Sequence, residues 1–408
     1  MSGTVRISER ALEFPDSPIR KLVPFAEQAR AKGVHVHALN IGQPDIATAA
    51  PFLEAIRRYD EPVVAYGRSE GEPELRAAIS DYYRGVGLDL KPEEIVVTVG
   101  GSEALLFALQ IVAEPGDEVL VFEPFYTNYN AFAQMSGVHL RPLRTHAAEG
   151  FHLPAEAELR AAIGPRTKAI LFCSPNNPTG TVLTLEELET LARVAREKGL
   201  FLISDEVYRE FVYEGRHTSL MELPGLERHA ILVDSVSKRY SACGARIGSL
   251  ATRNRDVRDA AVRLAQGRLC PPVVEQRAAV AMAGLGADFF APIREEYRRR
   301  RDATFEGLTS IPGVVCREPH GAFYIMAELP LPDCEAFARW LLTEFHRDGE
   351  TVMLAPGPGF YALGKYGREG QGLNQVRLAY VLEVPKLRRA MELLGAAVEE
   401  FQSVGTPS

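Results

Sequence analysis

The chain has 408 residues, 46% of them hydrophobic, so at about 150 residues per domain it can form two or three domains with substantial cores. Its net charge of −8 indicates a mildly acidic surface, which argues against a nucleic-acid binder. There is no run of about 18 apolar residues, and the first residues lack the apolar core of a signal peptide, so we expect neither a membrane span nor a secretory leader.

From about residue 94 the sequence alternates between short apolar strands and helices. Thr184 and Glu187 have the spacing of a capping box at the start of one such helix. Continuous apolar strands separated by helices are typical of a mostly parallel sheet that helices cover on both faces, with ligands at the carboxyl ends of the strands. The predicted strands are 95–99, 118–122, 169–173, 200–204 and 230–234, and the predicted helices include 102–112 and 185–198.

Beyond Asn254 the pattern changes to longer helices with a few strands, which predicts a smaller α+β unit. Four consecutive arginines, 298–301, are predicted to lie on a solvated helix face. We expect residues 1–45 to pack with the small unit, residues 46–285 to form the large domain and residues 286–408 to form the small domain. The predicted elements here are helices 256–266, 274–283, one ending near 308, 334–347 and 385–401, and strands 313–316, 322–326 and 375–380.

The five cysteines indicate a reducing compartment. Their number is odd, and no pair has the CxxC spacing of a zinc site or a redox motif. We therefore expect free thiols, no bound metal and a cytoplasmic location.

Lys238 is the first candidate for a catalytic residue. It ends the segment Ser235-Val236-Ser237-Lys238, directly after the predicted strand 230–234, and Arg246 follows eight residues later. An amine can condense with an aldehyde, and hydroxyls and a guanidinium can bind a phosphate. The segment therefore predicts a site for a phosphorylated aldehyde, although a lone lysine is usually a surface charge.

Two turns at predicted strand ends suit such a ligand. Val99-Gly100-Gly101-Ser102-Glu103 leads into a helix, where glycines and free N–H groups can approach a phosphate. An ordinary helix cap at Ser102 explains the same residues. Asn177, in Asn176-Asn177-Pro178-Thr179-Gly180, can direct its amide at a ring oxygen, or simply form a turn.

A carboxylate follows one predicted strand, and an arginine lies inside another. In Ser204-Asp205-Glu206-Val207-Tyr208, a carboxylate facing a pyridine nitrogen would keep that nitrogen protonated, and Tyr208 could bind a ring hydroxyl. A helix cap with a core tyrosine is the alternative. Arg377 lies inside the apolar segment 375–380 and needs an anionic partner there, either a substrate carboxylate or an internal Asp or Glu.

Together these segments resemble the class I/II aminotransferases, the pyridoxal 5′-phosphate (PLP)-dependent enzymes of fold type I in the aspartate aminotransferase superfamily. The matching segments extend from Ile41-Gly42-Gln43-Pro44-Asp45 to Arg377 and so cover nearly the whole chain. The most specific is Ser-x-Ser-Lys followed by the arginine of Gly-x-Arg-Ile-Gly. Asn-Asn-Pro-Thr-Gly and Asp-Glu-x-Tyr come next.

The resemblance implies a role for each matching residue. Lys238 would bind the cofactor covalently and later move a proton between the substrate Cα and the cofactor, and Asp205 and Tyr208 would assist it through the ring. Arg377 would bind the substrate α-carboxylate. The other implied contacts are Gly101, Ser102, Glu103, Ser235, Ser237 and Arg246 on the phosphate, Tyr126 stacked on the ring, Asn177 on the ring hydroxyl, and Gly42 and Asn177 beside the substrate.

The resemblance also implies a homodimer with shared active sites, because Tyr66 matches a tyrosine that reaches the phosphate of the neighbouring subunit. The implied reaction moves an amino group between an L-amino acid and a 2-oxo acid, with 2-oxoglutarate the expected partner and ping-pong kinetics. No nucleic acid or membrane is expected to take part.

The identity of the amino donor is open. Some relatives have a lysine at the position of Ser102 and a threonine at the position of Ile19, and the lysine helps to hold a distal carboxylate. Either another cation takes over here, with Arg20, Arg68 and Arg268 as candidates, or the donor is not aspartate. Arg268 can equally be an ordinary surface arginine.

Two other functions are compatible with the same residues. A PLP site of this kind could serve β-elimination, racemisation or oxidation, because the bond that breaks depends on its alignment with the ring plane. A non-catalytic PLP-binding sensor domain of a transcription regulator is the other alternative, although the residues before the matching segments contain no pair of basic helices.

Overall fold

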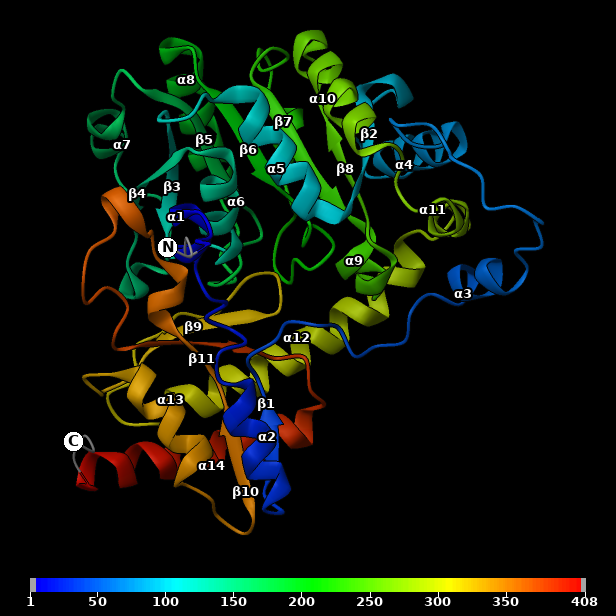
Figure 1. The fold of residues 1–408 in the computed structure, drawn as a ribbon. Coiled ribbons are helices and arrows are strands. Elements are labelled where there is room, and N and C mark those ends of the chain that lie inside the picture. Colours follow the sequence, from blue (N-terminus) through cyan, green and yellow to red (C-terminus); the bar gives the residue numbers. More distant parts are fainter. Residues whose placement is uncertain (1–4, 405–408) are drawn as a thin grey trace.

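The computed structural model of the chain describes residues 5–404, which form a larger part around a seven-stranded sheet and a smaller α+β part (Figure 1). The strand order in the large sheet is β2-β8-β7-β6-β5-β3-β4, and all strands except β8 run in the same direction. The predicted mostly parallel sheet is therefore confirmed. Its strands are β2 (Ile95–Val99), β3 (Glu118–Glu123), β4 (His139–Arg144), β5 (Thr167–Cys173), β6 (Phe201–Asp205), β7 (Ala230–Ser235) and β8 (Ile247–Ala251).

Helices cover both faces of this sheet because alternate residues of each strand point to opposite sides. In β7, Ile231 and Val233 pack with the cluster that includes α5 and α10, whereas Leu232 packs with the opposite cluster, which includes α4 and α8. The helices of this part are α3 (Ala50–Arg57), α4 (Pro73–Gly85), α5 (Gly100–Val112), α6 (Asn128–Ser136), α7 (Glu156–Ala162), α8 (Leu185–Lys198), α9 (Val236–Arg239), α10 (Arg255–Arg268) and α11 (Val273–Val280).

The smaller part contains a three-stranded sheet in the order β11-β12-β9 and a separate pair, β1 with β10. Because β1 lies near the N-terminus, its parallel pairing with β10 joins the start of the chain to this part. The elements are α1 (Glu9–Leu12), α2 (Val23–Ala31), β1 (His35–Ala38), α12 (Ala287–Thr309), β9 (Tyr324–Glu328), α13 (Cys334–Thr343), β10 (Glu350–Met353), β11 (Ala355–Pro356), β12 (Gln375–Ala379) and α14 (Val384–Val404).

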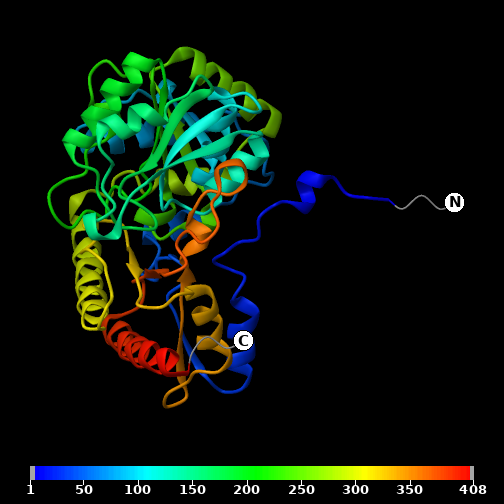
Figure 2. The same ribbon diagram turned by 90° about the vertical axis from the view of Figure 1, so that its left-hand side faces the viewer.

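Residues 5–14, which include α1, project from the body of the molecule in Figure 2. Val5, Ile7 and Leu12 of this segment are exposed. Among residues 5–404, no helix is both long enough and apolar enough to cross a membrane.

Two expectations from the sequence are wrong. Residues 313–316 form no strand, because only Val315 bridges to Glu328 of β9. The arginines 298–301 do not share a solvated face: Arg300 and Arg301 are buried, and Arg300 is paired with Asp45 and Glu296. Four consecutive helical residues point in four directions, so some of them must face the core.

The predicted capping box at α8 is confirmed. The Thr184 hydroxyl accepts from the Glu187 N–H at 3.2 Å, and the Glu187 carboxylate accepts from the Thr184 N–H at 2.7 Å. Without these two acceptors, the N–H groups of Thr184 and Glu187 at the start of the helix would have no partner.

We predict that Thr184→Ala lowers the free energy of unfolding by about 1 kcal/mol, because one amide of α8 loses its acceptor. The readout is the midpoint of thermal unfolding. Thr190→Ala, in the interior of α8, is the matched control and should cause no comparable loss, because alanine favours a helix interior. Equal losses in the two variants would contradict the cap assignment.

Candidate active site

A cavity of about 720 Å³ opens where the carboxyl ends of β5, β6 and β7 meet the start of α5, the N-terminal segment and the small sheet. This edge of a parallel sheet is the expected ligand position. Most of the sequence-predicted site residues line it, namely Gly42, Gly101, Ser102, Tyr126, Asn177, Asp205, Tyr208, Ser235, Ser237, Lys238, Arg246 and Arg377.

Lys238 lies on the one-turn helix α9, which follows β7 directly. The Ser235 hydroxyl caps this turn by accepting from the Ser237 N–H at 3.0 Å. The Lys238 Nζ donates to the carbonyl oxygen of Gly42 at 3.0 Å and lies 3.9 Å from the Cys243 Sγ. No carboxylate pairs with this amine in the described part of the chain. The amine is therefore held in the cavity without a permanent charge partner.

Asp205 ends β6 and is 3% exposed. Its Oδ2 accepts from the Tyr129 hydroxyl at 3.0 Å, and its Oδ1 accepts from the Val207 N–H at 3.4 Å. Burial raises the pKa of Asp205 to about 7, and these two hydrogen bonds oppose the rise. Within residues 5–404 no cation lies at ion-pair distance from this carboxylate, so a cationic ligand would stabilise it.

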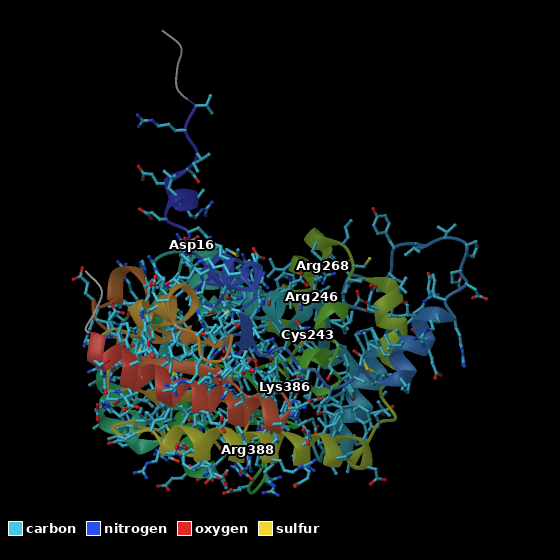
Figure 3. The ribbon with its side chains drawn as sticks, turned by 90° about the horizontal axis from the view of Figure 1, so that it is seen from below. Asp16, Cys243, Arg246, Arg268, Lys386 and Arg388 are labelled. Atoms are coloured by element: carbon cyan, nitrogen blue, oxygen red, sulfur yellow. The ribbon has the colours of Figure 1, made fainter. Side chains whose placement is uncertain are left out.

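Arg246 and the start of α5 form a compact anion site. The guanidinium donates to the carbonyls of Cys243 at 3.1 Å and Val99 at 3.4 Å. Gly100 has a φ of +72°, and a Cβ there would lie 2.3 Å from the Arg246 Nη2, so only glycine fits this turn. The first turn of α5 adds free N–H groups, and Ser235 donates to Ser237 at 2.7 Å beside it. Figure 3 labels Arg246 and Cys243, which approach each other from one segment.

Arg377, on β12, is 1% exposed and lies across the cavity from α5. Its Nη1 donates to the Asn177 side chain at 2.9 Å, its Nη2 donates to the Asn40 carbonyl, and its buried Nε has no partner in the described part of the chain. Burial lowers the pKa of Arg377. The described residues place no Asp or Glu at ion-pair distance, so the internal salt bridge considered from the sequence is absent from this part of the chain.

A chain of hydroxyls connects this arginine to Lys238. The Tyr208 hydroxyl accepts from the Asn177 amide at 3.4 Å and lies 3.0 Å from the Tyr324 hydroxyl. Tyr324 also reaches the Gly42 carbonyl, and a Cβ on Gly42 would lie 1.8 Å from its hydroxyl. Gly42 is therefore the residue that lets the N-terminal segment pass over Tyr324.

Tyr324 and Tyr129 were not identified from the sequence. Tyr324 lies in the apolar strand β9, and Tyr129 lies in the first turn of α6, so both match ordinary core positions. The sequence feature that could have indicated a polar role for Tyr324 is its hydroxyl inside an otherwise apolar strand.

Glu103 and Tyr66 do not line the cavity of this chain. The Glu103 carboxylate accepts from the Val99 N–H at 2.8 Å and pairs with Arg268 at 3.1 Å, so it closes the turn before α5. Tyr66 is 82% exposed on the segment between α3 and α4, which protrudes from the body in Figure 1.

The three arginines considered for a distal carboxylate differ in position. Arg268, labelled in Figure 3, is paired with Glu103 and is therefore neither a cavity residue nor a free surface charge. Arg68 is exposed and lies 3.8 Å from Glu70. Arg20 lines the cavity beside Ile19, and no acidic side chain of residues 5–404 pairs with it.

Comparisons with known proteins agree with this geometry. The family described as aminotransferase class I and II matches residues 34–353. The aspartate/prephenate aminotransferase of Thermus thermophilus is 36% identical over 399 residues, covering 96% of this chain and 94% of that protein.

Two solved structures are similar over almost the whole chain. The aspartate aminotransferase of Thermus thermophilus with maleate has a TM-score of 0.86 and 34% identity, and covers 97% of this chain and 100% of that one. An alanine aminotransferase of Pyrococcus furiosus has a TM-score of 0.87 and 32% identity with the same coverage.

The chain belongs to the class I and II aminotransferases, the PLP-dependent transaminases of fold type I. It therefore transfers amino groups between amino acids and 2-oxo acids with PLP as its cofactor. These relatives support transamination over the elimination, racemisation, oxidation and sensor functions that the residues alone left open.

The cavity residues fit this cofactor. The buried Asp205 carboxylate lacks a cation that a protonated ring nitrogen would provide, and Lys238 offers an amine for the aldehyde. The Arg246 guanidinium, the two serines and the start of α5 would suit a phosphate.

We predict a pH-dependent stability difference in the cofactor-free protein. The folded-state pKa of Asp205, about 7, lies above its ordinary value of 3.8, so the fold binds this proton more tightly than the unfolded chain does. The stability from this group is present below pH 3.8, falls as the pH rises towards 7 and is lost above it.

Asp205→Asn should therefore raise the thermal unfolding midpoint of the cofactor-free protein at pH 8, with a smaller effect near pH 4. With PLP bound, the native protein should have the higher unfolding midpoint, because the Asp205 carboxylate then has its cationic partner. A variant that is less stable than the native protein at pH 8 without PLP would contradict the assignment.

Proposed function

We propose that this enzyme passes the amino group of an L-amino acid to 2-oxoglutarate, with Lys238 moving the proton and Arg377 binding the substrate α-carboxylate. The proposal depends mainly on one observation. The amine of Lys238, the cation-free carboxylate of Asp205 and the buried guanidinium of Arg377 surround a single cavity at the sheet edge.

Lys238 is proposed to take the proton from the substrate Cα and to deliver it to the cofactor carbon that carried the aldehyde. The bound cofactor supplies an electron-accepting ring that stabilises negative charge at that Cα. A positioned acid–base group of this kind contributes about 10²–10⁴-fold to the rate. The Gly42 carbonyl holds the free amine at 3.0 Å, so the amine has a defined position when it is not bonded.

Arg377 is proposed to fix the substrate. Its Nη1 and Nη2 are already held by Asn177 and Asn40, and the rings of Tyr324 and Phe360 lie 4.6 Å and 4.9 Å from its guanidinium carbon. These contacts fix the plane of the guanidinium, so a planar carboxylate can bind with little loss of freedom.

The other predicted roles follow the same arrangement. Asp205 would keep the ring nitrogen protonated, and Tyr208 and Asn177 would bind the ring hydroxyl. Burial raises the pKa of Tyr208 well above its ordinary value, so its hydroxyl stays protonated and can donate. The proposed phosphate contacts are Gly101, Ser102, Glu103 through its backbone, Ser235, Ser237 and Arg246, with Tyr126 stacked on the ring.

Arg20 is the proposed contact for the distal carboxylate of 2-oxoglutarate. Relatives of this chain are named for aspartate, prephenate and alanine, so the fold leaves the substrate side chain open. Ser102 and Ile19 offer no charge at the cavity wall, whereas Arg20 lines it without an acidic partner in the part of the chain that the structure describes.

We further propose a homodimer in the cytoplasm. Tyr66 would complete the phosphate site of the partner, and its exposure together with that of Val63 and Val64 leaves an apolar segment to cover. The five free cysteines favour a reducing compartment. The proposed domains are residues 46–285 and 286–408, with the segment 1–45 joining the second; residues 1–4 and 405–408 lie outside the described structure.

The proposed reaction predicts a half-reaction with a single substrate. PLP-loaded protein should lose its yellow absorbance when the donor amino acid is added without any 2-oxo acid, and 2-oxoglutarate should restore it. Lys238→Ala should lose nearly all turnover. Release of ammonia or of racemised amino acid, without conversion of the cofactor, would contradict transfer to 2-oxoglutarate.

Arg20→Ala is predicted to raise the KM for 2-oxoglutarate by about three- to ten-fold, because a partly solvated ion pair is lost. The KM for pyruvate, a 2-oxo acid whose side chain carries no charge, should not change. Arg30→Ala, at an exposed position on α2 that does not line the cavity, is the matched control. If both variants have native kinetics with 2-oxoglutarate, Arg20 does not bind the distal carboxylate.

A further inference from the structure

Arg239, the neighbour of Lys238, lies in a buried cluster beneath the active site. Its side chain is 4% exposed and its Nη1 donates to the Asp234 Oδ2 at 2.6 Å. The guanidinium carbon lies 4.1 Å from the ring centroid of Tyr82 on α4. Asp234 is fully buried and also accepts from the Tyr83 hydroxyl at 2.7 Å. The residue after the catalytic lysine is thus tied to both β7 and α4.

A second active-site segment joins the same cluster. Arg209 follows Tyr208 in the turn after β6, and its guanidinium carbon lies 5.0 Å from the ring of Tyr83 and 5.7 Å from that of Tyr82. It lies 3.9 Å from Glu206. The turns that carry Lys238 and Tyr208 therefore each send one arginine to the same pair of tyrosines.

We propose that the Arg239–Asp234 pair and the tyrosines beneath it position Lys238. This inference rests on the proposed role of Lys238 and adds a positioning function for residues outside the cavity. None of the four residues Tyr82, Tyr83, Asp234 and Arg239 lines the cavity, so each acts through α9.

The need for such a device follows from the length of α9. A helix of one turn is unstable by itself, because nucleation fixes several residues for a single hydrogen bond. Ser235 caps the N-terminal end of α9, and Arg239 is the residue that fixes its C-terminal end. The backbone of Lys238 lies between these two anchors.

The chemistry of the cluster suits a rigid support rather than simple core filling. Replacing a buried ion pair by apolar side chains of similar volume is often neutral or stabilising, so the pair is a poor means of gaining stability alone. A guanidinium that is both stacked and hydrogen-bonded has one allowed orientation. The neighbouring charges raise the pKa of Arg239, and burial raises that of Tyr83, so neither changes its charge near neutral pH.

The test compares Arg239→Lys with the native enzyme. Lysine keeps the positive charge but loses the planar stack, so α9 should shift relative to the cavity. We expect kcat to fall by about 10- to 100-fold, as for a displacement of about 1 Å, with KM for the amino donor changed by less than about two-fold. The pH midpoint of the absorbance of the Lys238-bound cofactor should also move.

Arg301→Lys is the matched control, because Arg301 is an equally buried arginine of α12 that pairs with Glu318 instead. It should lower the thermal unfolding midpoint but leave kcat and the absorbance midpoint unchanged. Tyr83→Phe removes one hydrogen bond to Asp234 and keeps the ring, so it should change kcat and the absorbance midpoint in the same directions as Arg239→Lys, by less. If Arg239→Lys does not fold, the kcat and absorbance midpoint of Tyr83→Phe test the proposal by themselves.

The proposal is overturned if the folded variants of Arg239 and Tyr83 lose only thermal stability, as Arg301→Lys does. A native protein that takes up no PLP would instead refute the proposed role of Lys238. The two failures are therefore distinct.

Discussion

The active site depends on a buried carboxylate, Asp205, that has no cation at ion-pair distance among residues 5–404. Asp205 is fixed at the end of β6 by the hydroxyl of Tyr129 and by its own turn, yet burial raises its pKa to about 7. A fold gains nothing from such a group unless a cationic ligand arrives, and a protonated pyridine ring supplies that charge. The ion pair between Asp205 and a protonated ring would therefore both help to bind the cofactor and keep its ring able to accept electrons.

The rest of the molecule brings the other groups to this carboxylate. The parallel strands β6 and β7 end side by side, which places the turns bearing Tyr208 and Lys238 at one edge. The small sheet contributes Arg377, and the N-terminal segment contributes the Gly42 carbonyl. Four segments that are separated in the sequence thus share one cavity, and the buried arginines beneath it tie two of them, the turns after β6 and β7, to α4.

The sequence predicted the large sheet, its flanking helices and most cavity residues, because these depend on local apolar patterns and on motifs at strand ends. It did not predict that β8 runs antiparallel, since the direction of residues 247–251 is decided by their pairing with β7 and with the distant strand β2. The burial of Arg300 and Arg301 was also missed, because a run of like charges gives no sign of the partners that meet it. Tyr324 could not be predicted as a site residue, because its role arises only from contacts with Tyr208 and Gly42.

The most direct test of this account is to treat the PLP-loaded enzyme with borohydride, digest it and locate the cofactor by mass spectrometry. The account predicts that the cofactor mass is attached to the peptide that contains Lys238 and to no other peptide. Attachment to a different lysine, or no attachment in a protein that has bound PLP, would contradict it.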